Sequence, residues 1–122
     1  MLNITHASPN RLDLYVEGQI DAEEMRDGLN ALFAASTEIE DGVMYYEIGD
    51  VSVPTAGAIM VELGQLPKLL SLVGKFRRCA VLSDAAWVRK VAEIEGALFP
   101  GLTIQSFERG DRDAAEAWLA ED

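Results

Sequence analysis

Apolar and polar residues alternate with a period of two near the start of this chain and with a helical period later. Residues 11–18 place three aliphatic side chains on one face and polar or aromatic ones on the other, which predicts a half-buried strand. Residues 2–7 alternate more loosely, and the Pro9-Asn10 pair between the two segments predicts a turn. The first two strands are therefore expected to form a hairpin.

The next segment repeats its apolar residues at helical spacing. Asp21 is expected to cap this helix, with Glu24 placed to complete a capping-box-like start. The core-facing stripe consists of Ala22, Met25, Leu29, Leu32 and Phe33.

Residues 43–49 are almost continuously apolar, which predicts a central strand covered on both faces. A second helix is expected to begin near Thr55, and Pro67 is expected to kink it or split it in two. Its apolar stripe consists of Ile59, Met60, Leu63, Leu66, Leu69, Leu70 and Val73.

Two further strand–helix units complete the pattern. Strands are predicted over residues 76–82 and 102–107. Ser83 or Asp84 is expected to cap the helix between them, and Asp111 to cap the last helix. The expected core residues are Trp87, Val91, Ile94 and Leu98 in the first helix and Ala115, Trp118 and Leu119 in the second.

The order of elements is strand, strand, helix, then three strand–helix units. This order predicts an α/β fold with a mixed five-stranded sheet and about four helices, in one domain over residues 1–122. No apolar run has the length needed to cross a bilayer, and the first residues lack the pattern of a signal peptide. A cytoplasmic protein without integral membrane association is therefore expected.

Composition excludes several kinds of site. The net charge of −11 argues against non-specific binding to nucleic acid. A single cysteine, Cys79, rules out an internal disulfide, and its apolar surroundings indicate a buried structural thiol. With His6 as the only histidine, no metal site and no cofactor are expected.

The charge is unevenly distributed, because residues 68–90 hold six basic residues and one acid, a local charge of +5. A solvated face and a site for an anion, an acidic partner or lipid headgroups both fit this segment. Two of its residues, Arg77 and Arg78, are expected on opposite faces of their strand. The candidate basic patch consists of Lys68, Lys75, Arg77, Arg78, Arg89 and Lys90.

The junction between the third strand and the second helix is the leading candidate site. A helix N-terminus presents unpaired N–H groups and a partial positive charge, to which Thr55 adds a capping hydroxyl and Gly57 an absence of side-chain bulk. Such a terminus suits an anion or a phosphorylated side chain, and a purely structural cap is the alternative. The candidate binding residues are Asp50, Ser52, Pro54, Thr55, Ala56, Gly57, Ile59 and Met60.

The segment IGDVSVPTAGAIM, together with the order of elements, resembles the STAS domains, the family of anti-sigma-factor antagonists. In that family the corresponding loop carries an Asp-Ser-Ser-Gly run whose second serine is phosphorylated by a partner kinase. Residues Pro54-Thr55-Ala56-Gly57 correspond to that run, and Ala56 stands at the phosphorylated position. The resemblance therefore implies a regulatory module without the usual phosphoserine, and leaves Thr55 as the remaining phosphorylation candidate.

The second half of the chain holds a series of motif residues in strands, turns and helices: Asp84, Trp87, Arg89, Pro100-Gly101, Phe107 and Ala117-Trp118-Leu119. On these residues it resembles the SpoIIAA-like bacterial proteins of unknown function, which are grouped with the STAS and SEC14 folds. Together with the first half, this resemblance spans nearly the whole chain and implies a SpoIIAA-like fold.

Three functions are weighed. The leading hypothesis is a non-enzymatic module that binds a protein partner, or a second copy of itself, through the 50–57 loop and the adjacent helix. The second, implied by the SEC14-like fold, is a carrier of a lipid or small apolar ligand. The third is an enzyme that uses Glu47 and Asp50 as a carboxylate pair. The residues proposed to line an apolar pocket are Met25, Met44, Met60, Trp87 and Phe99.

Overall fold

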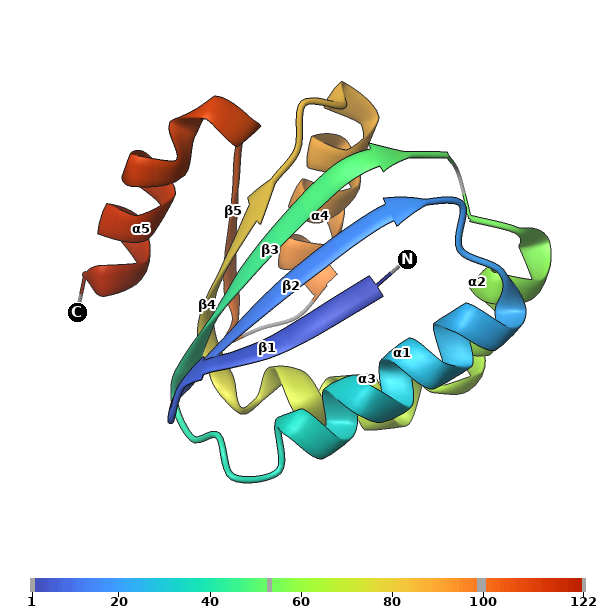
Figure 1. The fold of residues 1–122 in the computed structure, drawn as a ribbon. Coiled ribbons are helices and arrows are strands. Elements are labelled where there is room, and N and C mark those ends of the chain that lie inside the picture. Colours follow the sequence, from blue (N-terminus) through green and yellow to red (C-terminus); the bar gives the residue numbers. More distant parts are fainter. Residues whose placement is uncertain (1, 53, 99–100, 122) are drawn as a thin grey trace.

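The protein folds around a five-stranded mixed sheet with strand order β1-β2-β3-β4-β5 (Figure 1). The computed structural model describes residues 2–52, 54–98 and 101–121, and for 95 and 98 the backbone only. β1 and β2 form the expected antiparallel hairpin, and every later neighbour in the sheet is parallel. The strands are β1 (Leu2–Ser8), β2 (Arg11–Gly18), β3 (Gly42–Val51), β4 (Phe76–Leu82) and β5 (Thr103–Phe107).

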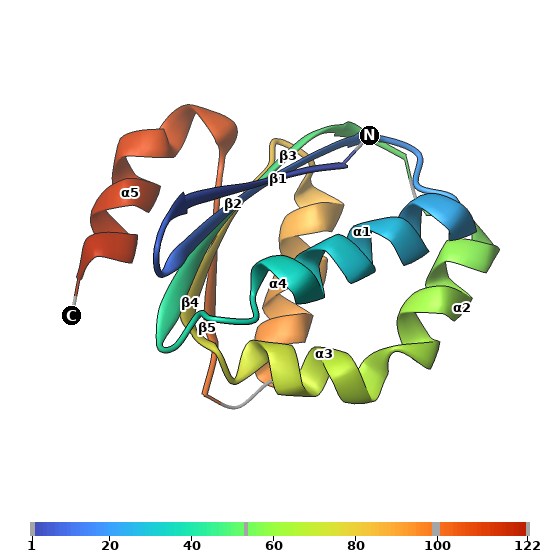
Figure 2. The ribbon, with the colours of Figure 1, turned by 60° about the horizontal axis from the view of Figure 1, so that its bottom comes forward.

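Helices cover the two faces of the sheet unequally. Figures 1 and 2 show α1 to α4 on one face and α5 alone on the other. β3 occupies the middle of the sheet, as its apolar sequence predicts. The helices are α1 (Ala22–Ala35), α2 (Ala56–Gly64), α3 (Leu66–Val73), α4 (Ala86–Leu98) and α5 (Arg112–Ala120), with the 3₁₀ turn η1 (Arg109–Asp111) before α5.

The larger core lies between the sheet and the four helices. Leu12 and Leu14 of β2 are buried there beside Cys79 and Val81 of β4. The smaller core lies under α5, where Ala115 and Leu119 pack against the sheet as expected. In the smaller core the rings of Phe107 and Trp118 lie 6.0 Å apart.

Pro67 divides the second predicted helix, so the described residues form five α-helices where about four are expected. α2 ends at Gly64, and Pro67 lies in the first turn of α3, where its missing N–H removes no helical hydrogen bond. No single helix in the described ranges is long and apolar enough to cross a membrane. α2 and α3 pass that length and composition test only as a pair, and the pair is bent by 65°.

The predicted inward stripe of α4 is wrong. Trp87 and Ile94 are 42% and 53% exposed, whereas Val88 and Ala92 are buried. The small residues of α4 face the sheet because β5 lies close beneath them: a β-carbon added at Gly96 would lie 3.4 Å from that of Ile104. The larger apolar side chains of α4 are thereby left outside.

The predicted caps are confirmed at Asp21 and are absent at Asp111. The Asp21 carboxylate accepts a hydrogen bond from the Glu24 N–H at 2.8 Å. Ser83 accepts one from the Ala85 N–H at 3.1 Å, just before α4. Asp111 occupies the N-cap position of α5 but makes no side-chain capping bond, because η1 leads the chain directly into the helix.

Candidate functional site

The junction after β3 is fixed by backbone and side-chain hydrogen bonds. The Thr55 hydroxyl oxygen accepts a hydrogen bond from the Ala58 N–H at 3.1 Å and so caps α2 as predicted. The Thr55 N–H donates to the Ile20 carbonyl at 3.1 Å, and the Ser52 N–H donates to the Gly18 carbonyl at 3.4 Å. The two bonds attach the loop to the last residue of β2 and to the segment that follows it, so the start of α2 has a defined position.

The other residues of the loop differ in exposure. Asp50, Ser52 and Ala56 are exposed, whereas Pro54 and Thr55 are half-buried. The residue at the phosphorylated position of the family run is therefore accessible but carries no hydroxyl. The hydroxyl of Thr55 is present but is already used as a helix cap.

A close helix–helix contact determines which side of α2 faces outward. A β-carbon added at Gly57 would lie 3.3 Å from the β-carbon of Ala22, so the two helices approach closely at this point. Ala58 is fully buried beside them. The larger apolar residues of α2 consequently point away from the protein.

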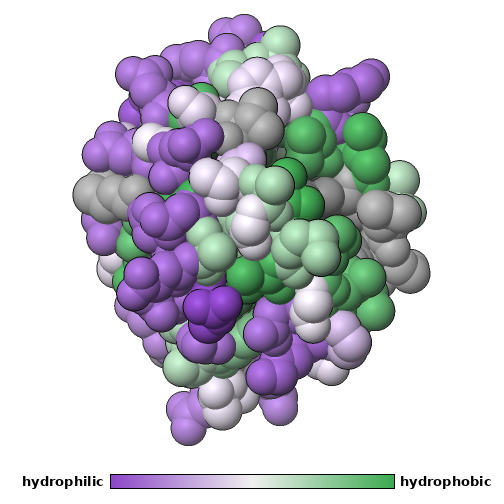
Figure 3. All heavy atoms as spheres, turned by 90° about the vertical axis from the view of Figure 1, so that its right-hand side faces the viewer, coloured by the Kyte–Doolittle hydropathy of each residue, from purple (hydrophilic) through white to green (hydrophobic). Residues whose placement is uncertain are grey.

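Among the residues whose side chains the structure describes, eight large apolar ones on α2, α3 and α4 are exposed, and we call these eight the apolar face. On α2, Met60 is 68% exposed and Leu63 is 58% exposed. Figure 3 shows apolar side chains gathered on the side of the molecule that carries α2, beside a hydrophilic region. Single exposed apolar residues are normal, but a contiguous group on a protein surface commonly marks an interaction site. The apolar face consists of Ile59, Met60, Leu63, Leu66, Leu70, Trp87, Val91 and Ile94.

The predicted basic patch is divided among α3, β4, α4 and the turn between α3 and β4 that holds Lys75. Lys68 lies over the ring of Phe33 at 5.9 Å, and the Lys75 ammonium donates to the Thr37 carbonyl at 3.1 Å. Arg89 donates to the Ser83 carbonyl at 2.7 Å. Lys90 lies 3.9 Å from Glu93 on the same helix. These contacts support the interpretation of a solvated basic surface with local structural roles.

Arg77 and Arg78 both reach the C-terminus of α5, contrary to the expectation that they point to opposite faces. Arg77 donates to the Glu121 carbonyl at 2.8 Å, and Arg78 donates to the Trp118 carbonyl. The pairing of β3 with β4 is irregular here, because Gly42 and Val43 pair with residues two apart in β4. The extra residue redirects the two side chains, which then bind the carbonyl groups that a helix end leaves unpaired.

A polar network between β3 and α5 was not predicted from the sequence. The two carboxylate oxygens of Glu47 lie 2.9 Å from Arg109 and 3.1 Å from Arg112. Arg112 also donates to the Tyr45 hydroxyl at 3.0 Å, which raises the pKa of Arg112, and the bond with Glu47 raises the pKa of Arg109. Glu47 is therefore bound into an ion-pair network, which gives no support to a catalytic pair with Asp50.

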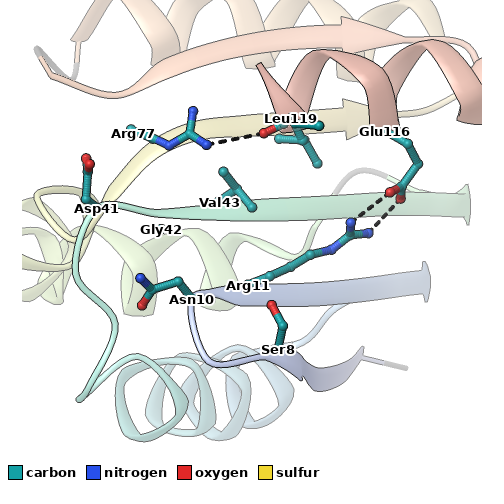
Figure 4. Close-up of a pocket in the computed structure, with 10 residues that line it drawn as sticks. Ser8, Asn10, Arg11, Asp41, Gly42, Val43, Arg77, Glu116 and Leu119 are labelled. Atoms are coloured by element: carbon teal, nitrogen blue, oxygen red, sulfur yellow. Dashed lines mark hydrogen bonds and ion pairs between the residues drawn. The ribbon is translucent and has the colours of Figure 1, made fainter. Parts of the chain in front are cut away.

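A shallow hollow of about 370 Å³ lies beneath the C-terminal half of α5 (Figure 4). Arg11 crosses it and binds Glu116 through two hydrogen bonds of 2.6 and 2.8 Å, which lowers the pKa of Glu116. This hollow is at the N-terminal ends of the parallel strands, whereas ligands of open α/β sheets bind at the C-terminal ends. Its arginines are already paired with protein groups, so we assign it no ligand.

The residues predicted to line an apolar pocket are not brought together. Met44 belongs to the main core, and Met25 packs against a separate cluster around Val16. Met60 and Trp87 lie on the apolar face, and Phe99 is outside the described residues. Within the described ranges, no three His, Cys, Asp or Glu side chains are placed to hold a metal ion.

The SpoIIAA-like family profile matches residues 11–120. The chain belongs to the SpoIIAA-like family. The match covers the sheet from β2 onward and all five helices, in agreement with the resemblance that the sequence motifs indicate. No curated protein sequence matches the chain.

Solved structures with the same fold include an uncharacterised SpoIIAA-like-fold protein from Shewanella loihica PV-4. It is 18% identical, with a TM-score of 0.76 over 98% of this chain and 93% of that one. The unphosphorylated anti-sigma factor antagonist SpoIIAA is 13% identical, with a TM-score of 0.55 over 99% of this chain and 100% of that one. The phosphorylated form of the Bacillus cell fate determinant SpoIIAA is 12% identical, with a TM-score of 0.59 over 97% and 99%. At these identities the likeness establishes the fold.

Proposed function

We propose that this member of the SpoIIAA-like family is a non-enzymatic regulatory module that binds a protein partner. The contact surface consists of the 50–57 loop and the outward side of α2, and it continues onto the rest of the apolar face. The partner is recognised by apolar contact, with the loop supplying polar groups at the rim.

The observation that carries this proposal is the exposure of Met60 and Leu63 directly beside the loop. These side chains lie on a helix whose inward side carries the fully buried Ala58 and, next to it, the close contact between Gly57 and Ala22. Their exposure is therefore a consequence of the packing. Protein interfaces combine such an apolar centre, in which methionine and aromatic residues are enriched, with a polar rim.

One of the SpoIIAA structures named above is a phosphorylated form, and this proposal treats phosphorylation differently for the present chain. Ala56 cannot accept a phosphate, and the Thr55 hydroxyl caps α2. A phosphate attached to Thr55 would still lie at the start of a helix, where negative charge is stabilised. Within the run Pro54-Thr55-Ala56-Gly57, Thr55 therefore remains the candidate for phosphorylation.

A second candidate function is the binding of a lipid or small apolar ligand. The apolar face favours it, since eight exposed apolar side chains suit an acyl chain as well as a partner helix. Against it, Met25 and Met44 are separated from Met60, so the predicted lining does not form one pocket. Any such ligand would lie on the surface of the helices.

The experiment that tests the proposal compares the wild-type protein with M60K/L63K in affinity capture from the source organism. N30K/A34K is the matched control, because Asn30 and Ala34 are also exposed and lie on α1, away from the apolar face. Capture of a partner by wild type and control, but not by M60K/L63K, supports the proposal. Equal capture by all three proteins contradicts it.

Native mass spectrometry of the same samples separates the remaining possibilities. An adduct that disappears on denaturation favours the apolar-ligand candidate, and a stable doubling of mass favours a second copy as the partner. A covalent phosphate retained on denaturation and located at Thr55 establishes that modification.

A further inference from the structure

The outer edge of β1 is open to pairing with another strand. β1 is the first strand of the sheet, and within the described part of the chain it pairs with β2 alone. In an antiparallel pair, alternate residues direct their N–H and C=O groups away from the partner strand. Proteins usually protect such an edge with charged residues, proline or a bulge. β1, with the sequence LNITHAS, contains no Pro, Lys, Arg, Asp or Glu, and its one irregularity lies between His6 and Ser8 at its end.

A hollow of about 330 Å³ runs between this strand and α1. Leu2 and Ile4 contribute to the wall on β1. The wall on α1 is formed by residues at helical spacing, which share one side of the helix. These residues are Glu24, Asp27, Gly28 and Ala31.

Small residues on α1 let β1 approach the helix closely. Leu2 lies over the bare backbone of Gly28, where an added β-carbon would come within 2.2 Å of the Leu2 side chain. Ala31 is the next residue along the same side of α1 and is also small. An open strand edge beside a helix, with a hollow between them, is the arrangement that accepts an added peptide strand.

The charge of the hollow selects the occupant. Two carboxylates, those of Glu24 and Asp27, line it, and none of the described lining residues is basic. We infer that this hollow and the open edge of β1 bind an extended peptide segment carrying lysine or arginine at alternate positions. The segment adds to β1 as a sixth strand. The peptide backbone pairs with β1, and every second side chain points toward the carboxylates of α1.

A second copy of this chain fits this hollow less well than a basic peptide. The β1 of another copy brings no lysine or arginine, and its own α1 would place two more carboxylates nearby. The inference concerns a different surface from the apolar face, because none of the lining residues belongs to that face. It therefore stands or fails independently of the proposed function.

The test uses the whole chain and the synthetic peptide (Lys-Val)₄, acetylated and amidated, with binding measured by fluorescence anisotropy and by amide hydrogen exchange. Two control peptides share its length: (Glu-Val)₄, which reverses the charge, and (Lys-Val)₄ N-methylated at alternate residues, which removes backbone donors. Binding of (Lys-Val)₄ alone, with slower exchange of β1 amides, is the expected result.

Variants locate the charge contact. D27N is expected to weaken binding about two- to fivefold, the effect of one exposed ion pair. D113N is the matched control, because Asp113 is an exposed acid on α5 at the opposite face of the sheet, and it is expected to leave the affinity unchanged.

Several results would overturn the inference. Undetectable binding of (Lys-Val)₄ would do so, as would equal binding of the N-methylated peptide, which would indicate general attraction to an acidic protein. Protection of β5 amides in place of β1 amides would place strand addition at the other edge. Equal affinities of the wild type and D27N would remove the proposed role of the α1 carboxylates.

Discussion

Gly57 lies against Ala22, and a β-carbon at Gly57 would approach that of Ala22 to 3.3 Å. This contact sets the distance between α1 and α2, and the burial of Ala58 beside it leaves Met60 and Leu63 on the solvent side of α2. A valine at position 57 must push the helices apart, so G57V is expected to lower the free energy of unfolding by about 1–3 kcal/mol. Urea denaturation measures the change.

Gly64 supplies the matched control for that substitution. It also lies in α2, but nothing lies within 4 Å of the position of its added β-carbon. G64V is expected to change stability by less than about 0.5 kcal/mol. Equal losses in G57V and G64V would show that helix spacing at Ala22 is not the cause.

The Thr55 cap contributes to the stability of α2 independently of any modification. T55A removes the oxygen that accepts the Ala58 N–H and is expected to cost about 1 kcal/mol. T55S retains a hydroxyl in the same place and is expected to lose much less. A T55A protein as stable as the wild type would mean that the cap is not formed in solution.

The apolar face is expected to tolerate charge without loss of stability. The side chains of Met60 and Leu63 are mostly exposed to water. The free energy of unfolding of M60K/L63K is therefore expected to lie within about 0.5 kcal/mol of that of the wild type. Thermal and urea denaturation check this directly. A loss of several kcal/mol would show that these side chains are packed inside the protein in solution.

Glu62 gives a prediction on pH. Burial raises the pKa of its carboxyl above the usual value, so the folded state retains its proton at a pH where the unfolded chain has lost it. This contribution to stability is fully present below the unfolded pKa of about 4.3 and is lost as the pH rises through the folded pKa. E62Q is therefore expected to melt at a higher temperature than the wild type at pH 7 and at a similar temperature at pH 4. A stabilising effect of E62Q that is larger in acid than at pH 7 would contradict the assignment.

Strands β2 and β3 could be predicted from sequence because each carries a pattern of apolar residues that fits one kind of burial. β2 alternates cleanly, and the continuous apolar run of β3 requires cover on both faces. The cap at Thr55 could also be predicted, since a helix start after a strand requires a hydrogen-bond acceptor for its first N–H groups.

The exposed side of α4 could not be predicted because that helix has apolar residues on two sides. Periodicity identifies the stripe through Trp87 and Ile94, but the close approach of β5 selects the smaller stripe through Val88 and Ala92 for burial. The network around Glu47 was missed for a different reason. Its arginine Arg109 is 62 residues away in the sequence, and only the folded sheet brings the two together.

The central claim is that a partner contacts the apolar face on α2, and site-specific photo-crosslinking in living cells tests it most directly. A benzophenone amino acid at position 60 reports on the apolar face. The control carries the same amino acid at position 30, in place of the exposed Asn30 of α1. The proposal predicts a discrete protein adduct at position 60 and none at position 30. Adducts at both positions, or a lipid adduct alone at position 60, would contradict a protein-binding role for this face.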